Sequence, residues 1–251
     1  MLCFNCKCEP RDKLKNKTKT EITHTKKLEM AESGSLVVLT GTDLQKCDKS
    51  IILALFNVIN TAYHRNNVKF NIMKNDRIKD VSLFLSDIGF DKNADNCVLI
   101  VYFEGPVANA HAFDVGVFEG IQVYTPKRSV KSIPPFSANN NILGTVGFKP
   151  HHEYADGEHF EVTSFTSLKP KLGTVLLPLC ENYFATLFKV KQYIAEVVVE
   201  HDLVPYYTEK HNYVETKRFF VPKDYDPVTT GLEPGIEAEP FFMATMIKDF
   251  N

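Results

Sequence analysis

The segment from His159 to Tyr213 constrains the fold of this chain more than any other part of it. Its opening run, HFEVTSFTSL, places apolar side chains at alternate positions and then slips by one residue at Phe165. Such a slip is typical of a strand that contains a bulge. The turn KPKLGT follows, and the run VLLPLCENYFATLFKV then carries apolar side chains at helical spacing. The segment therefore predicts a bulged strand that leads through a tight turn into a helix.

The turn before this helix is suited to an anion. Lys169, Lys171 and Gly173 lie in it, and free backbone amides at a helix start, beside cationic side chains, favour a phosphate or a pyrophosphate. Pro178 follows in the second turn of the helix, where it lacks the backbone N–H and so removes a helical hydrogen bond. We therefore expect the regular helix to begin near Leu177.

The rest of the segment predicts a buried strand and an aromatic cluster. QYIAEVVVEH is a continuous apolar run, typical of a strand that is covered on both faces. LVPYYTEKHNYVETKRFFVP then predicts a short helix begun by proline, a turn at Asn212 and a further strand. Tyr206 and Tyr207 are therefore expected close to the end of a buried strand.

In this order of elements the chain resembles the GCN5-related N-acetyltransferase (GNAT) superfamily. Its members have a bulged fourth strand, a pyrophosphate loop of the form Q/R-x-x-G-x-G/A, a long third helix, a splayed fifth strand and a Tyr-x-x-x-Gly-Phe-like ending. In the loop, Leu168 stands where Gln or Arg is usual, Lys171 where the first glycine is usual, and Gly173 is kept. In the ending, YYTEKHNY has one extra residue, and Asn212 and Tyr213 stand for Gly-Phe.

The resemblance implies an α/β fold of the GNAT type, with a mixed, mostly antiparallel central sheet whose fourth and fifth strands splay apart between flanking helices. It also implies transfer of an acetyl group from acetyl-CoA to a primary amine of a small molecule, by direct attack in a ternary complex. The departures at Leu168, Lys171 and Pro178 leave two alternatives open. One is a degenerate acyl-CoA-binding or regulatory module without catalysis, and the other is acetylation of protein or peptide amines.

The resemblance also assigns roles to residues. Tyr207 aligns best with the family tyrosine that donates to the coenzyme sulfur, and Tyr206 comes next because of the extra residue. Glu161, near the start of the bulged strand, is the expected base. Its competitors are the neighbouring groups Glu158, His159 and His152. The residues expected to bind the pantetheine arm and the pyrophosphate are Val162, Thr163, Ser164, Phe165, Leu168, Lys169, Lys171, Leu172, Gly173 and Thr174.

The region before His159 predicts the start of the same fold. LVVLTGTD reads as a strand, TDLQ as a capping box with Thr42 at the cap before a long helix, and IKDVSLFLSDIGF as a second helix stopped by Gly89. Between the strands CVLIVYFEG and ILGTVGFKP lies a long connection, Gly105 to Asn140, in which FDVGVFEGIQVY alternates as paired strands do. We expect this connection to shape the acceptor pocket, with aromatic residues Phe113, Phe118 and Tyr124. The tail EPFFMATMIKDF predicts a last edge strand.

Length and charge fit one soluble domain. The chain has 251 residues and a formal net charge of −2, which argues against a general nucleic-acid or membrane-surface binder. The sequence has neither a run as long as a membrane span nor the apolar core of a signal peptide, so we expect a cytoplasmic protein. Residues 34–251 are assigned to a single acetyltransferase-like domain. Dimers are frequent in the resembled family, which leaves a homodimer open, although the sequence carries no interface signature.

Other clusters of reactive side chains receive structural interpretations. Residues 1–33 are Lys-rich without apolar periodicity, which predicts a disordered arm; its Cys3, Cys6 and Cys8 lack a fourth metal ligand at suitable spacing. Cys180, on an apolar helix, and His201, at a strand end, are interpreted as structural. The loop HHEYADGEH matches no standard metal site, and no metal is assigned to it. Its ligand-type side chains are His151, His152, Glu153, Asp156 and His159.

Overall fold

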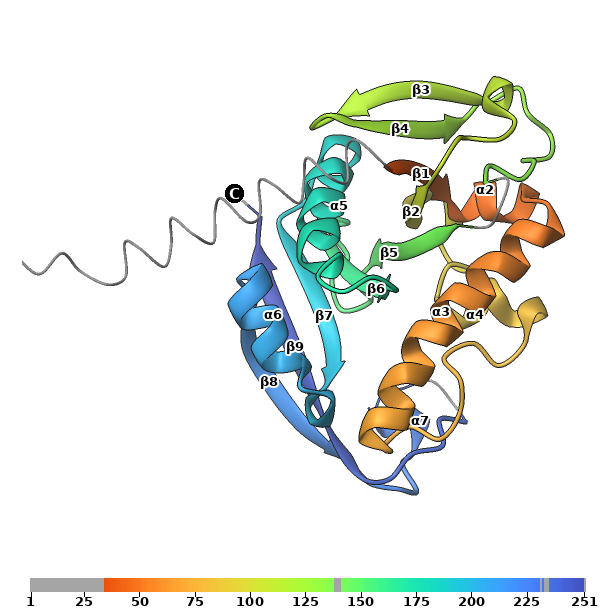
Figure 1. The fold of residues 1–251 in the computed structure, drawn as a ribbon. Helices are drawn as coiled ribbons and strands as arrows, with labels where there is room; N and C mark the ends of the chain where they lie inside the picture. The colour runs from red at the N-terminus through yellow and green to blue at the C-terminus, as the bar shows by residue number, and fades with distance from the viewer. Residues whose placement is uncertain (1–33, 138–140, 231, 233–234, 251) are drawn as a thin grey trace, which may run out of the picture.

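A single sheet organises the part of the chain that the computed structural model describes, residues 34–137, 141–230, 232 and 235–250. Its nine strands lie in the order β3-β4-β1-β2-β5-β6-β7-β9-β8 (Figure 1). The strands are β1 (Gly34–Thr40), β2 (Val98–Glu104), β3 (Phe113–Phe118), β4 (Ile121–Pro126), β5 (Ile142–Pro150), β6 (His159–Ser167), β7 (Gln192–Val198), β8 (Val214–Val221) and β9 (Phe241–Asp249). Neighbouring strands are antiparallel except for two parallel pairs, β1 with β4 and β6 with β7. The predictions for residues 1–33 lie outside the described residues.

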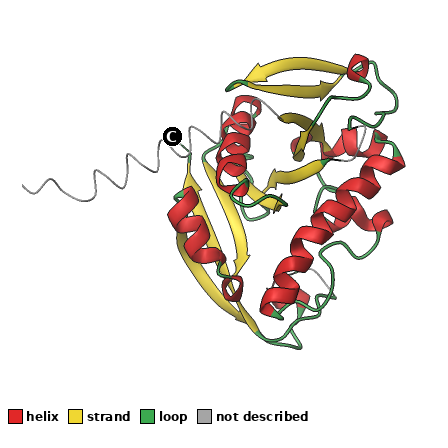
Figure 2. Cartoon of the chain, in the orientation of Figure 1, coloured by secondary structure: helices red, strands yellow, loops and turns green. Residues whose placement is uncertain are grey.

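Helices cover both faces of this sheet (Figure 2). They are α2 (Gly41–Lys46), α3 (Lys49–Phe70), α4 (Phe84–Asp87), α5 (Gly173–Leu187), α6 (Leu203–His211) and α7 (Pro227–Thr230), with short 3₁₀ turns η1 (Val81–Leu83), η2 (Ala94–Asn96), η3 (Ala110–Ala112) and η4 (Val199–His201). Side chains of α5 and α6 pack on one face, and those of α2, α3 and α4 pack on the other. None of these helices combines the length and apolar character needed to cross a membrane.

The predicted fold class is confirmed. A strand, two helical segments, antiparallel strands, a long helix, a strand that leaves its neighbour, a short helix and two final strands follow one another as in the GNAT fold. The β3–β4 hairpin is an insertion into this order. It pairs with β1 through β4, at Ser35 to Val37 and Gln122 to Tyr124, and therefore extends the sheet at the edge remote from β6 and β7.

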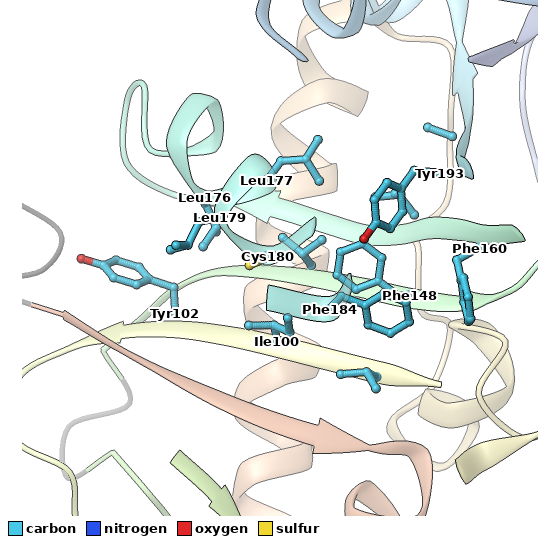
Figure 3. Packing of buried hydrophobic residues seen from close by; sticks show 14 of the residues in the cluster. Ile100, Tyr102, Phe148, Phe160, Leu176, Leu177, Leu179, Cys180, Phe184 and Tyr193 are labelled. Atoms are coloured by element: carbon cyan, nitrogen blue, oxygen red, sulfur yellow. The ribbon is translucent and has the colours of Figure 1, made fainter. Parts of the chain in front are cut away.

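The face covered by α5 holds the densest aromatic packing. Phe184 of α5 stacks on Phe148 of β5 with ring centroids 4.5 Å apart, and it meets Phe160 of β6 edge-on at 4.8 Å (Figure 3). Tyr193 of β7 closes the group at 5.5 Å from Phe148. Because all four rings are buried, this cluster fixes α5 across three successive strands.

Two helix starts differ from the sequence prediction. The capping box at α2 uses Thr40 and Asp43 rather than Thr42, since the Thr40 hydroxyl accepts from the Asp43 amide and the Asp43 carboxylate accepts from the Thr40 amide. Helix α5 begins at Gly173 and continues through Pro178, so the expectation of a start near Leu177 was wrong. Proline removes only one bond there, and the buried residues on both sides of it hold the helix together.

Two other predicted elements are corrected. The second helix is reduced to the turn η1 and the single turn α4, because Asp80 caps η1 at Ser82 and Gly89 adopts a φ of +75° immediately after α4. The tail forms β9, which lies inside the sheet between β7 and β8 and is not an edge strand. Alternating apolar residues cannot distinguish these positions, because an interior strand with one covered face shows the same pattern.

Candidate functional site

Strands β6 and β7 are neighbours in the sheet but pair over only part of their length. They pair in parallel only at His159–Gln192, Phe160–Tyr193 and Glu161–Ile194. Beyond those positions β6 continues to Ser167 and β7 to Val198 without pairing to each other. This β6–β7 opening is the predicted splay, and it leaves backbone groups of β6 unpaired on the side that faces β7.

A bulge in β6 marks the start of the opening. The register between β5 and β6 shifts at Thr145 and Gly147, opposite Ser164, which adopts a left-handed φ of 49°. The Thr145 hydroxyl donates to the Ser164 carbonyl at 2.6 Å and so holds the bulge in place. Ser164 is completely buried, and among the described residues its hydroxyl has no hydrogen-bond partner. The one-residue slip of the apolar pattern at Phe165 thus corresponds to the bulge at Ser164. The backbone of Ser164 is strained, and its carbonyl is held by Thr145.

The paired end of β6 is held by ion pairs. Lys191 lies 2.5 Å from Glu158 and 3.4 Å from Asp156, and Lys189 lies 2.6 Å from Glu158. The pKa of Asp156 is lowered to about 2, first by the backbone amide of Glu158 and then by the hydrogen bond with His159. These contacts join the β5–β6 turn to the residues just before β7, and they close the sheet at one end of the opening.

The loop at the other end of β6 has the conformation of a glycine-containing loop. Lys171 stands at the position of the family's first glycine, and its φ is 65°. An L-residue in this region is strained by about 1 kcal/mol relative to glycine. Lys171, in place of the glycine, therefore keeps the backbone conformation of the loop but lowers the stability of the folded protein.

Part of the expected anion cradle is available. The amides of Leu172 and Gly173 donate within the loop, at 3.3 and 3.1 Å. In the described part of the chain, the amides of Lys171 and Thr174 donate no hydrogen bond. Two donors at the start of α5 are thus open to an anion.

The cations around this loop are not those the sequence suggested. Lys169 is held by Glu104, with 2.6 Å between Nζ and the carboxylate, while Lys171 is exposed. Arg65 of α3 donates to the carbonyl of Leu168 at 3.2 Å, which places a guanidinium beside the loop. Sequence reasoning missed Arg65 because an arginine on the exposed side of a helix gives no local signal of what lies opposite.

Aromatic side chains fill the α6 side of the β6–β7 opening. Tyr206 stacks with Phe165 at 6.4 Å and meets His211 at 4.9 Å. Its hydroxyl lies so close to Gly173 that a Cβ on that glycine would be only 2.7 Å away. Burial raises the pKa of Tyr206 to about 12, so its hydroxyl keeps its proton at neutral pH. The predicted residues Tyr206, Phe165 and Gly173 are therefore brought together.

Tyr207 occupies a different environment from its neighbour. It is buried in the core and meets Tyr213 edge-on at 5.2 Å. Burial raises the pKa of Tyr207 well above its ordinary value, and the next contribution comes from Tyr63 of α3. Tyr63 lies on α3, the helix that packs on the opposite face of the sheet.

Two carboxylates lie on the α3 side where the strands separate. Glu161 forms an ion pair with Lys149 of β5, at 3.2 Å. Glu196, two residues beyond the last paired residue of β7, faces the same side and accepts a hydrogen bond from Thr245 at 2.9 Å. The pKa of Glu196 is raised, mainly because surrounding protein excludes water and also because of the charge of Glu161. Glu196 is nonetheless exposed at the surface of the sheet, so solvent weakens the effect of burial on its pKa.

Glu196 is a candidate that the sequence analysis overlooked. It is the charged residue in the run QYIAEVVV, which was interpreted as covered on both faces. The sequence feature that could have identified Glu196 is a carboxylate inside an otherwise apolar strand. Such a group needs either a partner or an opening in the sheet.

One group of side chains among the described residues has the spacing of metal ligands. Ligand atoms of His151, His152 and Glu161 lie within 4.8 Å of one another. Burial lowers the pKa of His151, and its Nδ1 accepts from the amide of Glu153 at 3.3 Å. With the ammonium of Lys149 already at Glu161, the carboxylate has a cation partner from the protein itself.

Cys180 and His201 have the surroundings of packed structural side chains. Cys180 is fully buried, which raises the pKa of its thiol, and His201 is buried and stacks on Phe70.

The connection between β8 and β9 packs at the end of β7. It pairs with the segment after α3 at Met73 and Ala238, and the Lys74 amide donates to the Glu237 carbonyl at 2.8 Å. Apolar residues of both segments pack on Val198, at the end of β7. The connection from Gly105 to Asn140 places its hairpin on β1, at the edge of the sheet remote from β6 and β7, and its role in shaping the acceptor pocket stays a prediction.

Comparison with solved structures finds acetyltransferases. A spermidine N-acetyltransferase from Vibrio cholerae, solved in complex with CoA and spermine, is 10% identical with a TM-score of 0.48 and covers 86% of this chain and 95% of that one. An N-acetyltransferase from Staphylococcus aureus Mu50 is 11% identical with a TM-score of 0.45, and the match covers 86% and 97% of the two chains. Likenesses of this degree carry no functional argument, and the fold assignment rests on the strand order.

The strand order and the β6–β7 opening define a mixed α/β protein of the GNAT fold class. Within that class, the chain belongs to the family described as Sporulation protein RMD6, whose family model matches residues 29–250. Sporulation protein RMD6 of Saccharomyces cerevisiae (strain ATCC 204508 / S288c) is 27% identical over 228 residues, which are 86% of this chain and 96% of the yeast protein.

Proposed function

We propose that this protein is an N-acetyltransferase that uses acetyl-CoA and a small primary amine, with its active site at the β6–β7 opening. The observation that carries the proposal is the early end of the parallel pairing at Glu161 and Ile194, directly before a bulge and a loop with free amides. An unpaired strand edge that leads to a helix N-terminus suits a ligand with amide groups at one end and phosphates at the other.

The residues present fit the phosphate end of acetyl-CoA. The free amides of Lys171 and Thr174 would hold the diphosphate, and the side chains of Lys171 and Arg65 supply positive charge beside them. The unpaired edge of β6 between Ser164 and Ser167 would meet the amides of the pantetheine arm. When bound, acetyl-CoA supplies the activated acyl group, and the protein supplies binding, orientation and proton transfer.

For the base we favour Glu196 and keep Glu161 as its competitor. An alkylammonium ion must lose a proton before its nitrogen can attack, and a carboxylate with a raised pKa is better matched to that task than an ordinary one. The raised pKa belongs to Glu196, whereas Glu161 is engaged by Lys149. Glu161 then contributes negative charge that both holds an incoming ammonium group and raises the pKa of its neighbour.

For the proton donor we favour Tyr206 over Tyr207. Tyr206 lies against Gly173 at the start of α5, and with a pKa of about 12 its hydroxyl remains a donor at neutral pH. Tyr207 is packed into the core beside Tyr213. The role proposed for Tyr207 is to position Tyr206 and α6.

Calorimetric titration with acetyl-CoA tests the binding half of the proposal. We expect binding that weakens for analogues with trimmed phosphates and for Arg65→Ala. The matched control is Arg128→Ala, an exposed arginine in the segment that follows β4. Equal affinity for the trimmed analogues, or equal effects of the two arginine variants, would remove the phosphate site.

Release of free thiol in the presence of a panel of amines tests the catalytic half. For Glu196→Gln we expect at least a hundredfold lower kcat/KM, as for loss of a general base, together with loss of the rise in rate with pH on the acid side. Glu161→Gln should lower the rate less and shift that rise to lower pH, because a nearby negative charge is removed. The reverse ranking would assign the base to Glu161.

A second function is favoured by one observation. Tyr206, Phe165 and His211 fill the opening on the α6 side, which suits a module that binds acyl-CoA weakly or serves in regulation without catalysis. Coenzyme binding without thiol release for any amine would support this alternative. Acetylation of a peptide amine is tested in the same assay by adding peptides to the panel.

A further inference from the structure

The two edges of the sheet differ in how they are protected from pairing with another strand. At one edge, β8 carries Glu215, Lys217 and Arg218, and its register with β9 shifts between Glu215 and Lys217. Charged side chains and a bulge on an edge strand are ordinary defences against edge-to-edge association. These charges and the bulge protect the middle of this edge, although Val214 and Phe220 of β8 are exposed.

The other edge, β3, lacks these defences at its centre. Val115 and Val117 are 55% and 73% exposed, and the residue between them is Gly116. In the described part of the chain β3 has no neighbour on its outer side, and it runs along the outside of the molecule in Figure 1. A bare edge with two exposed valines is a template for another strand.

The geometry points to a second copy of this chain as the occupant, paired antiparallel along β3 about a two-fold axis through Gly116. The run Val115-Gly116-Val117 reads the same in both directions around that glycine. With Gly116 on the axis, Val115 of each copy lies opposite Val117 of the other, which makes two apolar cross-strand pairs. A two-fold interface requires such a self-complementary patch.

Charge also fits this register. Asp114 of one copy lies opposite Phe118 of the other, so the two carboxylates do not face each other. The hairpin reaches the rest of the sheet only through β4 and β1, so pairing would join two sheets without blocking the β6–β7 opening. The inferred dimer is therefore independent of the proposed acetyl transfer.

Analytical ultracentrifugation of the full chain over a concentration series is the first test. We expect a monomer–dimer equilibrium that Val117→Lys shifts at least tenfold toward monomer, since a lysine at an edge protects it. Phe220→Lys is the matched control, because Phe220 is 54% exposed on the opposite edge strand, β8. A monomer at every concentration, or equal effects of the two substitutions, would overturn the inference.

Cross-linking tests the register. In Gly116→Cys the two new cysteines would face each other across the axis, and opposed Cα atoms in an antiparallel pair lie roughly 4.5–5.5 Å apart, within disulfide range. A Cβ at Gly116 would have open space around it. Val115→Cys is the control, because its two copies would be offset by about 6.6 Å along the strands.

We expect mild oxidation to link Gly116→Cys dimers more completely than Val115→Cys dimers or the parent chain, which carries cysteines of its own. Matching circular dichroism spectra and melting temperatures would establish that each variant is folded. Equal linkage of the two cysteine variants would overturn the proposed axis even if a dimer forms.

Discussion

The two ends of β6 lie on one strand and are built in opposite ways. At the His159 end, β6 pairs with β7, and ion pairs join Asp156 and Glu158 to Lys191. At the Ser167 end the pairing is lost, a residue is held in a left-handed conformation, and aromatic rings replace the neighbouring strand. The opening in the sheet is thus bounded by ion pairs at one end of β6 and covered by aromatic side chains at the other, where two left-handed residues lower stability.

The largest expected effect contrasts core residues at these two ends. Phe160→Ala removes a buried ring that contacts Phe184 and Phe188, and should lower the free energy of unfolding by about 3–5 kcal/mol. Phe165→Ala, at the open end, removes a partly exposed ring and should cost about 1–2 kcal/mol. Urea unfolding measures both values. Equal losses would mean that the open end is packed as a true core.

The bulge offers a smaller effect of opposite sign. Ser164→Gly removes a left-handed serine and a buried hydroxyl without a partner, and should raise the free energy of unfolding by about 1 kcal/mol. Thr163→Gly is the control, because Thr163 is a buried strand residue and its replacement should destabilise the protein. A destabilised Ser164→Gly variant would show that the hydroxyl makes a contact that the bulge requires.

Lys171 tests whether the loop serves a phosphate. Lys171→Gly relieves its positive φ and should raise the free energy of unfolding by about 0.5–1 kcal/mol. If the proposed site is correct, the same change should weaken acetyl-CoA binding by roughly tenfold, because a phosphate loses a charged partner. Thermal unfolding and calorimetry measure the two effects separately. Greater stability with unchanged binding would mean that the lysine does not contact the coenzyme.

The smallest effect concerns the closed end in acid. The pKa of Asp156 is lowered from 3.8 to about 2 in the folded protein, so its contribution to stability is present above pH 4 and is lost as the pH falls toward 2. Asp156→Asn should therefore show a shallower loss of stability over that interval than the parent. Because the carboxylate is exposed, the difference should be small and should shrink in high salt. Parallel pH curves would mean that the contacts of the Asp156 carboxylate do not stabilise the folded protein.

Local elements of this protein were largely predictable. The apolar slip at Phe165 predicted the bulge, the turn residues predicted the loop, and helical spacing predicted α5. The lysine at position 171 was recognised as a departure, and the structure adds that its backbone still has the conformation of a glycine. These features depend on residues close together in the chain, which is why periodicity and turn chemistry report on them.

Contributions from distant segments were not predictable. Arg65 reaches the loop from α3, Glu196 lies beside Glu161, and the β8–β9 connection, rather than the long one before β5, packs at the end of β7. Each depends on which strands become neighbours, and the tail that looked like an edge strand lies inside the sheet as β9.

The sequence by itself determined the strands, the bulge and the turn before α5, because local sterics and hydrophobic periodicity specify each of them, and its resemblance to the GNAT superfamily supplied the class of fold. Only the tertiary structure decided where β6 and β7 stop pairing, which of two adjacent tyrosines lies at the loop, and which sheet edge is left bare. The physical reason is that these outcomes depend on contacts between residues far apart in the chain, such as Asp156 with Lys191 and Tyr206 with Gly173.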